Sequence, residues 1–263
     1  MYAQKYGAWA LITGAAMGLG AEFALQLAQK GMNIIAVDHN LAALKKTAHA
    51  LQEQTSVQIR PIHLDLSSAD FLEQLIAQIK DCEVGVLVNN AGISKIGYFT
   101  AQSPDFLATQ LHINTKVVLL LSRHFAHQMQ QRRKGAIIIL SSGAGELSSA
   151  YNAAYSASKA FDLKLAESLW AELQPDGIDV LGFMPGPTRT PGYIAQGGDP
   201  QGALVISTQA SVRQALKALG KYPNYVAGGI GGRLGHFILT RFFPVSLRIK
   251  IVSKQIQKMF HLP

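Results

Sequence analysis

Short apolar runs alternate with stretches of helical periodicity along most of this chain. The apolar runs lie at residues 8–13, 33–37, 57–64, 84–88, 136–140 and 177–184. The helical stretches lie at 22–30, 41–54, 71–79 and 104–131, and another continues past Lys159 to about 173. Apolar strands separated by amphipathic helices predict a parallel sheet covered by helices on both faces. We therefore expect a single doubly wound α/β domain over residues 1–263.

Composition excludes several other classes of protein. Hydrophobic residues make up 48% of the chain and charged residues 15%, which rules out a largely disordered protein. The single cysteine, Cys82, cannot form an internal disulfide, and we find no spacing typical of metal ligands. The N-terminus lacks the pattern of a signal peptide, and no apolar stretch is long enough to span a bilayer. We expect a cytoplasmic protein.

A glycine-rich turn joins the first apolar run to the first helix. It reads Gly14-Ala-Ala-Met17-Gly18-Leu19-Gly20. Glycines let the backbone turn tightly and approach a pyrophosphate, which the amides at a helix N-terminus bind. A tight turn can also be purely structural, but here it follows a strand and opens a helix. This context favours a Rossmann-like dinucleotide-binding fold, with a crevice at the carboxyl ends of the strands.

Asp38 ends the second apolar run, about twenty residues beyond the glycine turn. A carboxylate there accepts hydrogen bonds from the adenosine ribose hydroxyls and repels a 2′-phosphate. The neighbouring His39 is not the arginine that would hold such a phosphate, and Met17 is uncharged. The sequence therefore predicts NAD rather than NADP. Asp38 can also cap the helix at 41–54, and this alternative is compatible with NAD binding.

Tyr155 and Lys159 are four residues apart at the start of a predicted helix, so they share one helical face. A nearby ammonium favours the phenolate, which makes such a pair an acid–base group at neutral pH. Ser142 follows the strand at 136–140 and can donate a hydrogen bond to a substrate oxygen. This set indicates carbonyl and alcohol chemistry, although Tyr-x-x-x-Lys alone is often only structural. Asn114 interrupts an apolar helical stretch, either as a functional amide or as a satisfied core residue.

These motifs, taken together and in order, resemble the classical short-chain dehydrogenase/reductase family over residues 7–190. The matching residues are Thr13-Gly-x-x-x-Gly18-x-Gly20, Asn89-Asn-Ala-Gly92, Asn114, Ser142, Tyr155-x-x-x-Lys159 and Pro185-Gly-x-x-x-Thr190. The resemblance implies that Tyr155 is the catalytic acid–base, that Ser142 orients the substrate, and that Lys159 lowers the tyrosine pKa and binds the nicotinamide ribose. It also implies that Asn114 holds a water of a proton relay.

The resemblance also implies a cofactor site and a substrate site. The expected cofactor residues are Gly14, Met17, Gly18, Leu19, Gly20, Asp38, His39, Asp65, Leu66, Asn90, Ala91, Gly92, Tyr155, Lys159, Pro185, Gly186, Thr188 and Thr190. The expected substrate residues are Ile93, Ser94, Ser142, Ala144, Leu147, Tyr151, Tyr155 and Met184, with a mobile, lid-like loop at 191–200 inside a substrate region that runs to about residue 220.

The chain looks closest to members that act on bulky lipophilic substrates, of the 17β-hydroxysteroid and long-chain 3-oxoacyl type. We expect an NAD-dependent oxidoreductase that interconverts a secondary alcohol and a ketone, and as a hypothesis one that oxidises alcohols in the cell. The alternatives are an NADP-linked 3-oxoacyl reductase and a non-catalytic dinucleotide sensor or scaffold on the same fold. Family members commonly form homodimers or homotetramers through the helices near 105–131 and 151–174.

The C-terminal region is strongly basic. From Arg213 onward the chain has nine Lys or Arg and no Asp or Glu, and the extension at 233–263 reads as two apolar helices broken at Pro244. In the second helix an apolar face, Val245, Ile249, Val252, Ile256 and Met259, lies beside a row of lysines at 250, 254 and 258. This helix either packs on the core with a solvated basic face, or binds an anionic membrane or an acidic carrier protein. Nucleic acid is not expected.

Overall fold

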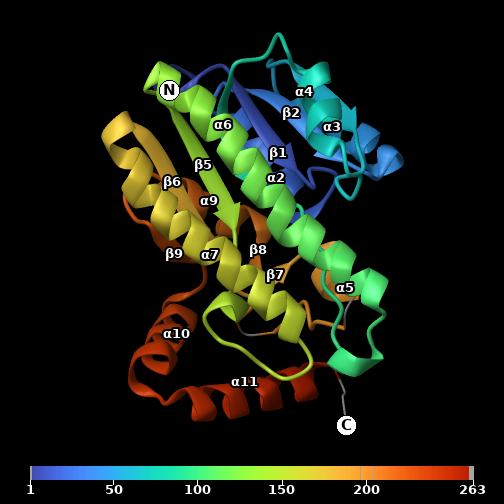
Figure 1. Ribbon diagram of the computed structural model, residues 1–263, viewed down its shortest axis with the longest axis vertical. Coiled ribbons are helices and arrows are strands. Elements are labelled where there is room, and N and C mark those ends of the chain that lie inside the picture. The colour runs from blue at the N-terminus through green and yellow to red at the C-terminus, as the bar shows by residue number, and fades with distance from the viewer. Residues whose placement is uncertain (1, 196, 203, 261–263) are drawn as a thin grey trace.

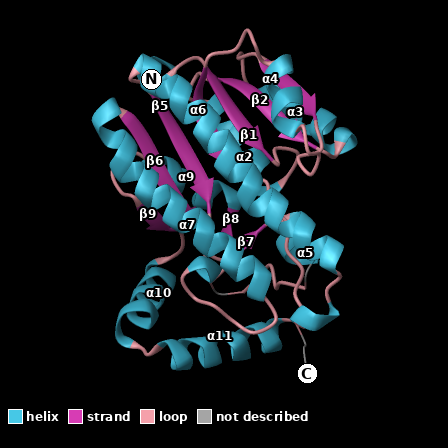
Figure 2. Ribbon diagram, in the orientation of Figure 1, coloured by secondary structure: helices cyan, strands magenta, loops and turns pink. Residues whose placement is uncertain are grey.

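A seven-stranded parallel sheet forms the centre of the molecule. The structure, a computed structural model, describes residues 2–195, 197–202 and 204–260. The strand order is β3-β2-β1-β4-β5-β6-β9, and every neighbouring pair is parallel. Figure 2 shows the strands in magenta between the helices. The strands are β1 (Trp9–Thr13), β2 (Asn33–Asp38), β3 (Ile59–His63), β4 (Val84–Asn89), β5 (Gly135–Leu140), β6 (Ile178–Met184) and β9 (Asn224–Val226). The order reverses between β1 and β4, where such sheets bind dinucleotides. The predicted doubly wound fold is confirmed.

Helices cover both faces of the sheet. One face packs on α2 (Gly18–Ala28), α3 (Leu41–Gln54) and α9 (Thr208–Ala218), and the other on α4 (Phe71–Gln78), α6 (Val118–Arg132) and α7 (Ala153–Leu173), which Figure 1 shows running past β5 and β6. Alternate strand residues enter opposite layers: Ile12 packs in the first and Leu11 in the second, both fully buried. Because both faces of the central strands are buried, β1, β4 and β5 are almost entirely apolar.

Three segments differ from the sequence-based expectation. Residues Tyr2–Tyr6 form a helix, α1, ahead of the first of the helical stretches that the sequence predicts. The helix expected at 104–131 is divided into α5 (Pro104–Leu111) and α6 by a π-helical turn at His112–Val117. The substrate region beyond β6 contains β7 (Thr188–Arg189), α8 (Pro191–Ala195) and β8 (Ile206–Ser207), and β7 pairs with β8.

The C-terminal extension forms two helices at one end of the molecule. They are α10 (Ile230–Phe242) and α11 (Val245–Met259), separated at Pro244 as the sequence predicts, while residues 261–263 lie outside the described part of the chain. Figure 1 shows both helices below the arrowheads of the central strands, with α11 running under the loop that leads into α7. The extension therefore lies at the end of the sheet where the candidate site residues gather. Within the described ranges, no helix is long and apolar enough to cross a membrane.

Candidate active site

The glycine turn is held in a conformation that only small residues permit. Gly14 and Gly18 have φ values of +65° and +59°, in the left-handed region. A Cβ on Gly20 would lie 2.0 Å from the Gly14 carbonyl oxygen, so the start of α2 packs directly on the turn. The Asn90 side chain, from the end of β4, donates hydrogen bonds to the carbonyls of Thr13 (2.8 Å) and Gly14 (3.0 Å). The Asn90 side chain therefore holds the glycine turn in place through the backbone carbonyls of the turn.

The residues around this turn fit a dinucleotide. The N-cap of α2 is Met17, whose thioether replaces the oxygen that usually caps a helix, so the first amides of α2 suit an external anion. The turn also meets the segment after β6, because a Cβ on Gly18 would lie 3.4 Å from the Thr190 side chain. Gly92 is exposed, yet a Cβ there would lie 3.6 Å from the Lys159 Nζ. Gly92 therefore lies at the surface, directly beside the buried lysine.

Asp38 is buried at the carboxyl end of β2, beside the turn. Its two carboxylate oxygens accept hydrogen bonds from the amides of Ala16 and Asn40, each at 2.9 Å. The alternative in which Asp38 caps α3 is wrong, because Asn40 is the N-cap and its side chain accepts from the amide of Ala43. His39 is exposed, and its Nδ1 lies 3.4 Å from Asp38 Oδ1. The structure therefore fixes a carboxylate next to the glycine turn.

Asp65 and Leu66 follow β3 at the same edge of the sheet. Asp65 Oδ1 accepts two hydrogen bonds from Ser67, from the amide and from the hydroxyl, both at 2.8 Å. These hydrogen bonds lower the pKa of the Asp65 carboxyl below its ordinary value. Leu66 is buried. The acid is exposed at the surface of the crevice, and the apolar residue anchors the segment below it.

Lys159 is buried beneath the end of β5. Its ammonium donates to the carbonyl of Leu140 (2.7 Å) and to Asp162 Oδ2 (2.9 Å), and it lies 5.9 Å from the centre of the Tyr155 ring. Burial lowers the pKa of Lys159, but the charges of Asp162 and Tyr155 outweigh burial, so that the pKa lies above its ordinary value. A permanently charged ammonium beside a half-buried phenol is an arrangement suited to proton exchange.

Asp162 is a site residue that the sequence reasoning missed. Its side chain is fully buried, and burial raises its pKa from 3.8 to about 6, although Lys159 opposes this shift. Among the residues that the structure describes, no donor reaches its second oxygen, Oδ1. The available signal was an acid three residues beyond Lys159, on the same helical face as that lysine. At neutral pH the carboxyl is ionised and neutralises the buried ammonium.

Ser142 lies just after β5, whose last residue, Leu140, accepts a hydrogen bond from Lys159. The preceding residue, Ser141, donates from its hydroxyl to the carbonyl of Lys159 at 2.6 Å, which ties the end of β5 to α7. The Ser142 hydroxyl accepts a hydrogen bond from the amide of Ala144 at 3.2 Å, so its own proton is directed elsewhere. The structure thus brings the expected serine and lysine segments together around the end of β5.

Asn114 is fully buried in the π-helical turn. Its side chain accepts from the amide of Ile93 (2.9 Å) and donates to the carbonyl of the same residue (3.0 Å) and to the Ser158 hydroxyl (3.1 Å). π-helical turns inside helices are common at functional sites. The Asn114 amide is therefore fully hydrogen-bonded, as expected of a satisfied core residue. It also positions the segment after Gly92 beside the helix that carries Tyr155.

The expected substrate residues gather from three segments, and the C-terminal helix adds to them. Tyr151 adopts a left-handed φ of +66°, and its ring contacts the Tyr98 ring edge-on with centroids 5.1 Å apart. Its hydroxyl accepts a hydrogen bond from Gln257 of α11 at 2.9 Å, and Ser253 accepts one from the amide of Ala150. No sequence motif connects α11 with this region. Ile93, Ser94, Ala144 and Leu147 are partly exposed around it, whereas Met184 is buried and offers little surface to a ligand.

The loop after β6 completes this edge of the sheet. The amide of Gly186 donates to the carbonyl of Ala227, beyond β9, and the Thr188 hydroxyl donates to the carbonyl of Gly186 at 2.8 Å. A Cβ on Gly186 would lie 2.7 Å from the Ala227 oxygen. Pro185, Gly186, Thr188 and Thr190 are therefore held by the last strand, and Thr190 reaches the glycine turn.

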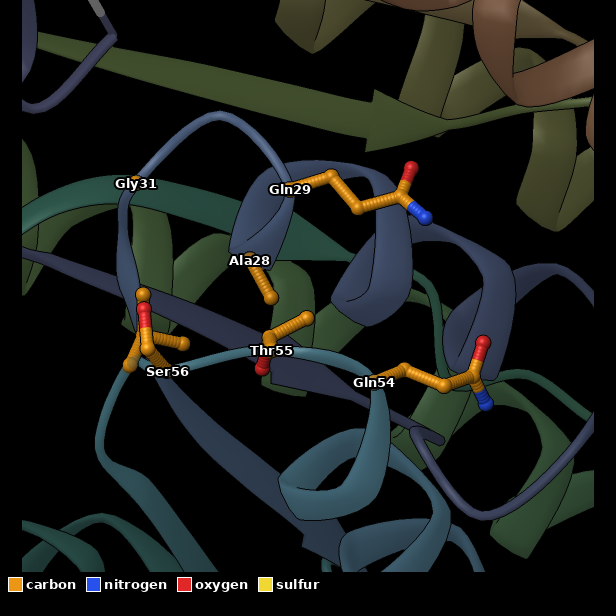
Figure 3. A pocket seen from close by; sticks show the side chains of 7 residues that line it. Ala28, Gln29, Gly31, Gln54, Thr55 and Ser56 are labelled. Carbon is orange, nitrogen blue, oxygen red and sulfur yellow. The ribbon is translucent and has the colours of Figure 1, made fainter.

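A separate hollow lies at the opposite edge of the sheet. Figure 3 shows this hollow of about 360 Å³ between the end of α2 and the segment that enters β3. Its lining, Ala28, Gln29, Gly31, Gln54, Thr55, Ser56 and Val57, contains no ionisable side chain. Because it lies at the amino ends of β2 and β3, it is distant from the residues described above and we assign it no chemistry.

The fold and the site define a dinucleotide-binding oxidoreductase with a tyrosine and a lysine at its centre. The short chain dehydrogenase family matches residues 8–197. A 7beta-hydroxysteroid dehydrogenase of Clostridium sardiniense is 30% identical over 229 residues, covering 86% of this chain and 88% of the relative. The 17-beta-hydroxysteroid dehydrogenase type 3 of Rattus norvegicus is 29% identical over 193 residues, covering 72% and 63% respectively.

Solved structures agree with these similarities. A structure solved for insights into 7beta-hydroxysteroid dehydrogenase stereoselectivity superposes with a TM-score of 0.89 at 26% identity, covering 95% of this chain and 98% of the other. The chain belongs to the short-chain dehydrogenase/reductase family. It is an NAD(P)-dependent oxidoreductase that acts on a hydroxyl or keto group.

Proposed function

We propose that the protein interconverts a secondary alcohol and a ketone on a lipophilic, steroid-like substrate, with NAD as its preferred cofactor. The observation that carries this proposal is the buried ammonium of Lys159, fixed by Leu140 and Asp162 and 5.9 Å from the Tyr155 ring. A buried charge costs free energy unless it is paired with an opposite charge. The Lys159 ammonium is paired with Asp162, and it lies beside the Tyr155 phenol, which can exchange a proton with a substrate hydroxyl.

Each residue has a distinct role in the proposed reaction. In the oxidation direction the Tyr155 oxygen takes the proton of the substrate hydroxyl, and in reduction it returns that proton to the carbonyl oxygen. Lys159 stabilises the negative charge on the phenol oxygen, and Ser142 donates a hydrogen bond to the substrate oxygen. Asn114 positions the Ile93 segment beside Lys159 and belongs to the proposed proton relay. The nicotinamide cofactor, when bound, supplies or accepts the hydride.

Two observations support a lipophilic substrate. The relatives at about 30% identity include dehydrogenases named for hydroxysteroids, and one of them aligns over 86% of this chain. The segments around the site also present aromatic and aliphatic surface, for example Tyr98 at 52% exposure and Ile194 at 47%. Such side chains suit a rigid apolar substrate with one polar group for the site to orient.

The preference for NAD rests on Asp38. Its carboxylate is held by two backbone amides next to the glycine turn, so it cannot turn away from a ligand there. A fixed negative charge at this position repels a 2′-phosphate and accepts hydrogen bonds from ribose hydroxyls. We expect a higher kcat/KM with NAD than with NADP, and Asp38→Ser should reduce that ratio. A clear preference of the native protein for NADP would contradict this part of the proposal.

The proposed activity is tested by NADH formation on a panel of hydroxysteroids and other hydrophobic secondary alcohols. Tyr155→Phe should abolish turnover while cofactor binding, measured by NADH fluorescence, is retained. Tyr222→Phe is the control, because Tyr222 is a surface residue with 51% exposure and lies outside the site. Turnover that survives in Tyr155→Phe would refute the role of the phenol, and an absence of turnover on every substrate would favour a dinucleotide sensor.

A second candidate activity is reduction of a 3-oxoacyl thioester with NADPH. It is supported by the very-long-chain 3-oxoacyl-CoA reductase-like protein At1g24470 of Arabidopsis thaliana, which is 36% identical over 182 residues, covering 67% of this chain and 58% of the relative. The same assay with a long-chain 3-oxoacyl thioester and NADPH distinguishes the two candidates, because only the reductase consumes NADPH with this substrate.

We also propose that the chain forms a homodimer or homotetramer through the helices at about 105–131 and 151–174. Apolar side chains on the surface of these helices support this assembly: Leu111, Leu119 and Phe161 have exposures of 47%, 42% and 38%. Sedimentation velocity of the native protein and of Leu119→Glu tests the interface. A monomeric native protein would refute it.

A further inference from the structure

The last two helices, α10 and α11, form a unit whose apolar side faces outward. We refer to residues 230–259 as the C-terminal helix pair. The most exposed apolar residues of α10 are Ile230, Leu234, Phe237 and Phe242, with exposures of 87%, 55%, 53% and 70%. Residues 230, 234 and 237 recur at helical spacing and so form one stripe. A helix at the surface of a globular protein normally buries such a stripe.

The opposite side of α10 contacts the protein and is mostly small or polar. Gly232, Gly235, His236 and Thr240 are half-buried there, together with one apolar residue, Leu239. His236 Nε2 lies 2.5 Å from a carboxylate oxygen of Glu146, in the loop after Ser142. The orientation is therefore determined by contacts and is the reverse of that in an ordinary amphipathic surface helix. An outward apolar stripe of this kind marks a binding surface.

The second helix adds a row of positive charge and fixes the pair to the rest of the protein. Lys250, Lys254 and Lys258 recur every four residues on α11, and all three are exposed. A neighbouring side of α11 contacts the loop before α7, where Ser253 bonds to Ala150 and Gln257 to Tyr151. Arg248 donates to the carbonyl of Thr240 at 3.2 Å, which joins the two helices.

The positive charge of the C-terminal helix pair distinguishes between two possible binding partners, a second copy of the chain and a lipid surface. The C-terminal helix pair contains six Lys or Arg and no Asp or Glu. A second copy that docked through the same surface would bring two sets of like charges together, which is unfavourable. An anionic lipid surface instead offers apolar acyl chains to the stripe and negative headgroups to the bases, the combination that interfacial helices use.

We propose that the C-terminal helix pair is a membrane-docking surface that binds anionic lipid bilayers from one side. The exposed stripe of α10 enters the headgroup region, while the basic side chains of both helices contact the lipid phosphates. Because α11 also contacts the loop around Tyr151, docking brings the proposed substrate region next to the bilayer, where a lipophilic substrate is concentrated. The docking itself requires neither cofactor nor substrate.

The experiment is co-sedimentation of the native protein with vesicles, without cofactor or substrate, at an ionic strength of about 0.15 M. We expect binding to vesicles of phosphatidylcholine mixed with phosphatidylglycerol, and little binding to phosphatidylcholine alone. Replacement of Leu234 and Phe237 by Gln should abolish binding. Replacement of Lys250, Lys254 and Lys258 by Gln should weaken it on the order of a hundredfold, from the usual contribution of a basic residue near an anionic surface.

A charge-matched control separates a local surface from general attraction. Lys45, Lys46 and Lys80 are exposed on α3 and after α4, which lie at the far end of the molecule in Figure 1. Their replacement by Gln removes the same charge and should leave vesicle binding unchanged. Equal loss in the control, or no binding of the native protein to anionic vesicles, overturns the proposal.

A second copy of the chain is the outcome that sedimentation velocity detects. If the native protein ignores vesicles and the Leu234 and Phe237 replacements convert a larger species into a smaller one, the stripe is a protein interface instead of a lipid-binding surface. Thermal unfolding of each variant checks that it is folded. The steady-state assay on a water-soluble alcohol is read separately, so a failure of docking is distinguishable from a failure of the proposed activity.

Discussion

Replacement of Asp162 by Asn tests whether a buried carboxylate sets the charge of the catalytic lysine. The variant keeps the shape of the side chain and removes its charge 2.9 Å from the Lys159 ammonium, where both side chains are almost fully buried. Two unit charges at this separation attract by about 6 kcal/mol at an effective dielectric constant of about 20. This attraction is one of the causes that hold the pKa of Lys159 above its ordinary value, so its loss should lower that pKa.

The consequence for activity follows from the position of the ammonium. If Lys159 is neutral, the Tyr155 ring loses a positive charge 5.9 Å from its centre. At the same effective dielectric constant this attraction is about 3 kcal/mol. We therefore expect the half-maximal pH of kcat/KM for alcohol oxidation to rise by about one to two units in Asp162→Asn. At pH 7 the rate should fall by about ten- to a hundredfold, while NADH binding is retained.

The assay is the pH profile of kcat/KM with a hydrophobic secondary alcohol, compared with that of Lys164→Gln. Lys164 and Glu167 form an ion pair of the same spacing on the same helix, but the lysine side chain is 75% exposed. An exposed pair contributes only about 0.2–1 kcal/mol, so this control should keep the native profile. An unchanged profile in a folded Asp162→Asn protein would refute the reasoning, because it would show that the ammonium keeps its charge without the carboxylate.

The same residue predicts how stability depends on pH. The pKa of Asp162 is about 6 in the folded protein and 3.8 in its reference state, so between these values the folded protein binds a proton more strongly than the unfolded chain. Its contribution to the free energy of unfolding is therefore greatest below about pH 4 and declines by about 3 kcal/mol as the pH rises to about 6. Urea denaturation of the native protein and of Asp162→Asn between these pH values measures the difference. A constant difference between the two would contradict the raised pKa.

Two further predictions concern the glycine turn and the C-terminal helix pair. Gly20→Ala should destabilise the protein by about 1–3 kcal/mol or more and weaken NADH binding, because its Cβ would lie 2.0 Å from the Gly14 oxygen. The control is Gly231→Ala, whose Cβ meets open space and which should change neither stability nor NADH binding. Urea denaturation with and without NADH measures the two effects. His236→Ala should remove about 1.5–3 kcal/mol of hydrogen bonding between α10 and Glu146. The backbone amides of residues 230–242 should then exchange faster with solvent, as hydrogen exchange measures. Unchanged exchange would show that other contacts hold α10.

Most of the fold could be predicted because its signals are local. A strand buried on both faces is a nearly continuous apolar run, as Trp9–Thr13 and Gly135–Leu140 are, and a helix such as Leu41–Gln54 has matching boundaries in the sequence and the structure. The π-helical turn at His112–Val117 could not be predicted, since it arises from the tertiary contacts of Asn114 with the segment after Gly92. The three-residue strand at Asn224–Val226 is weak as a sequence signal and is defined mainly by pairing with β6.

The candidate site was predictable to the extent that each residue follows a strand or occupies a helical turn. The four-residue spacing alone places Tyr155 and Lys159 on one helical face. The glycine-rich turn is recognisable because only glycine adopts its backbone conformation easily. The role of Asp38 was only partly readable, because two residue types near the start of α3 can cap it and only the structure shows that Asn40 does. Asp162 was missed because periodicity defines a face of α7 without showing that this face is buried against β5.

The same limit explains why the C-terminal helix pair needs coordinates to be interpreted. Periodicity in residues 230–259 predicts an apolar face and a basic face, but not which of them contacts the protein. On α11 the polar residues Ser253 and Gln257 contact the loop before α7, the lysines face solvent, and Val245 and Ile249 of the predicted apolar face are exposed as well. On α10 the polar residue His236 contacts Glu146, and Ile230 and Phe237 lie outside. One hydrogen bond to the loop after Ser142 therefore accompanies the apolar surface from which we infer membrane docking.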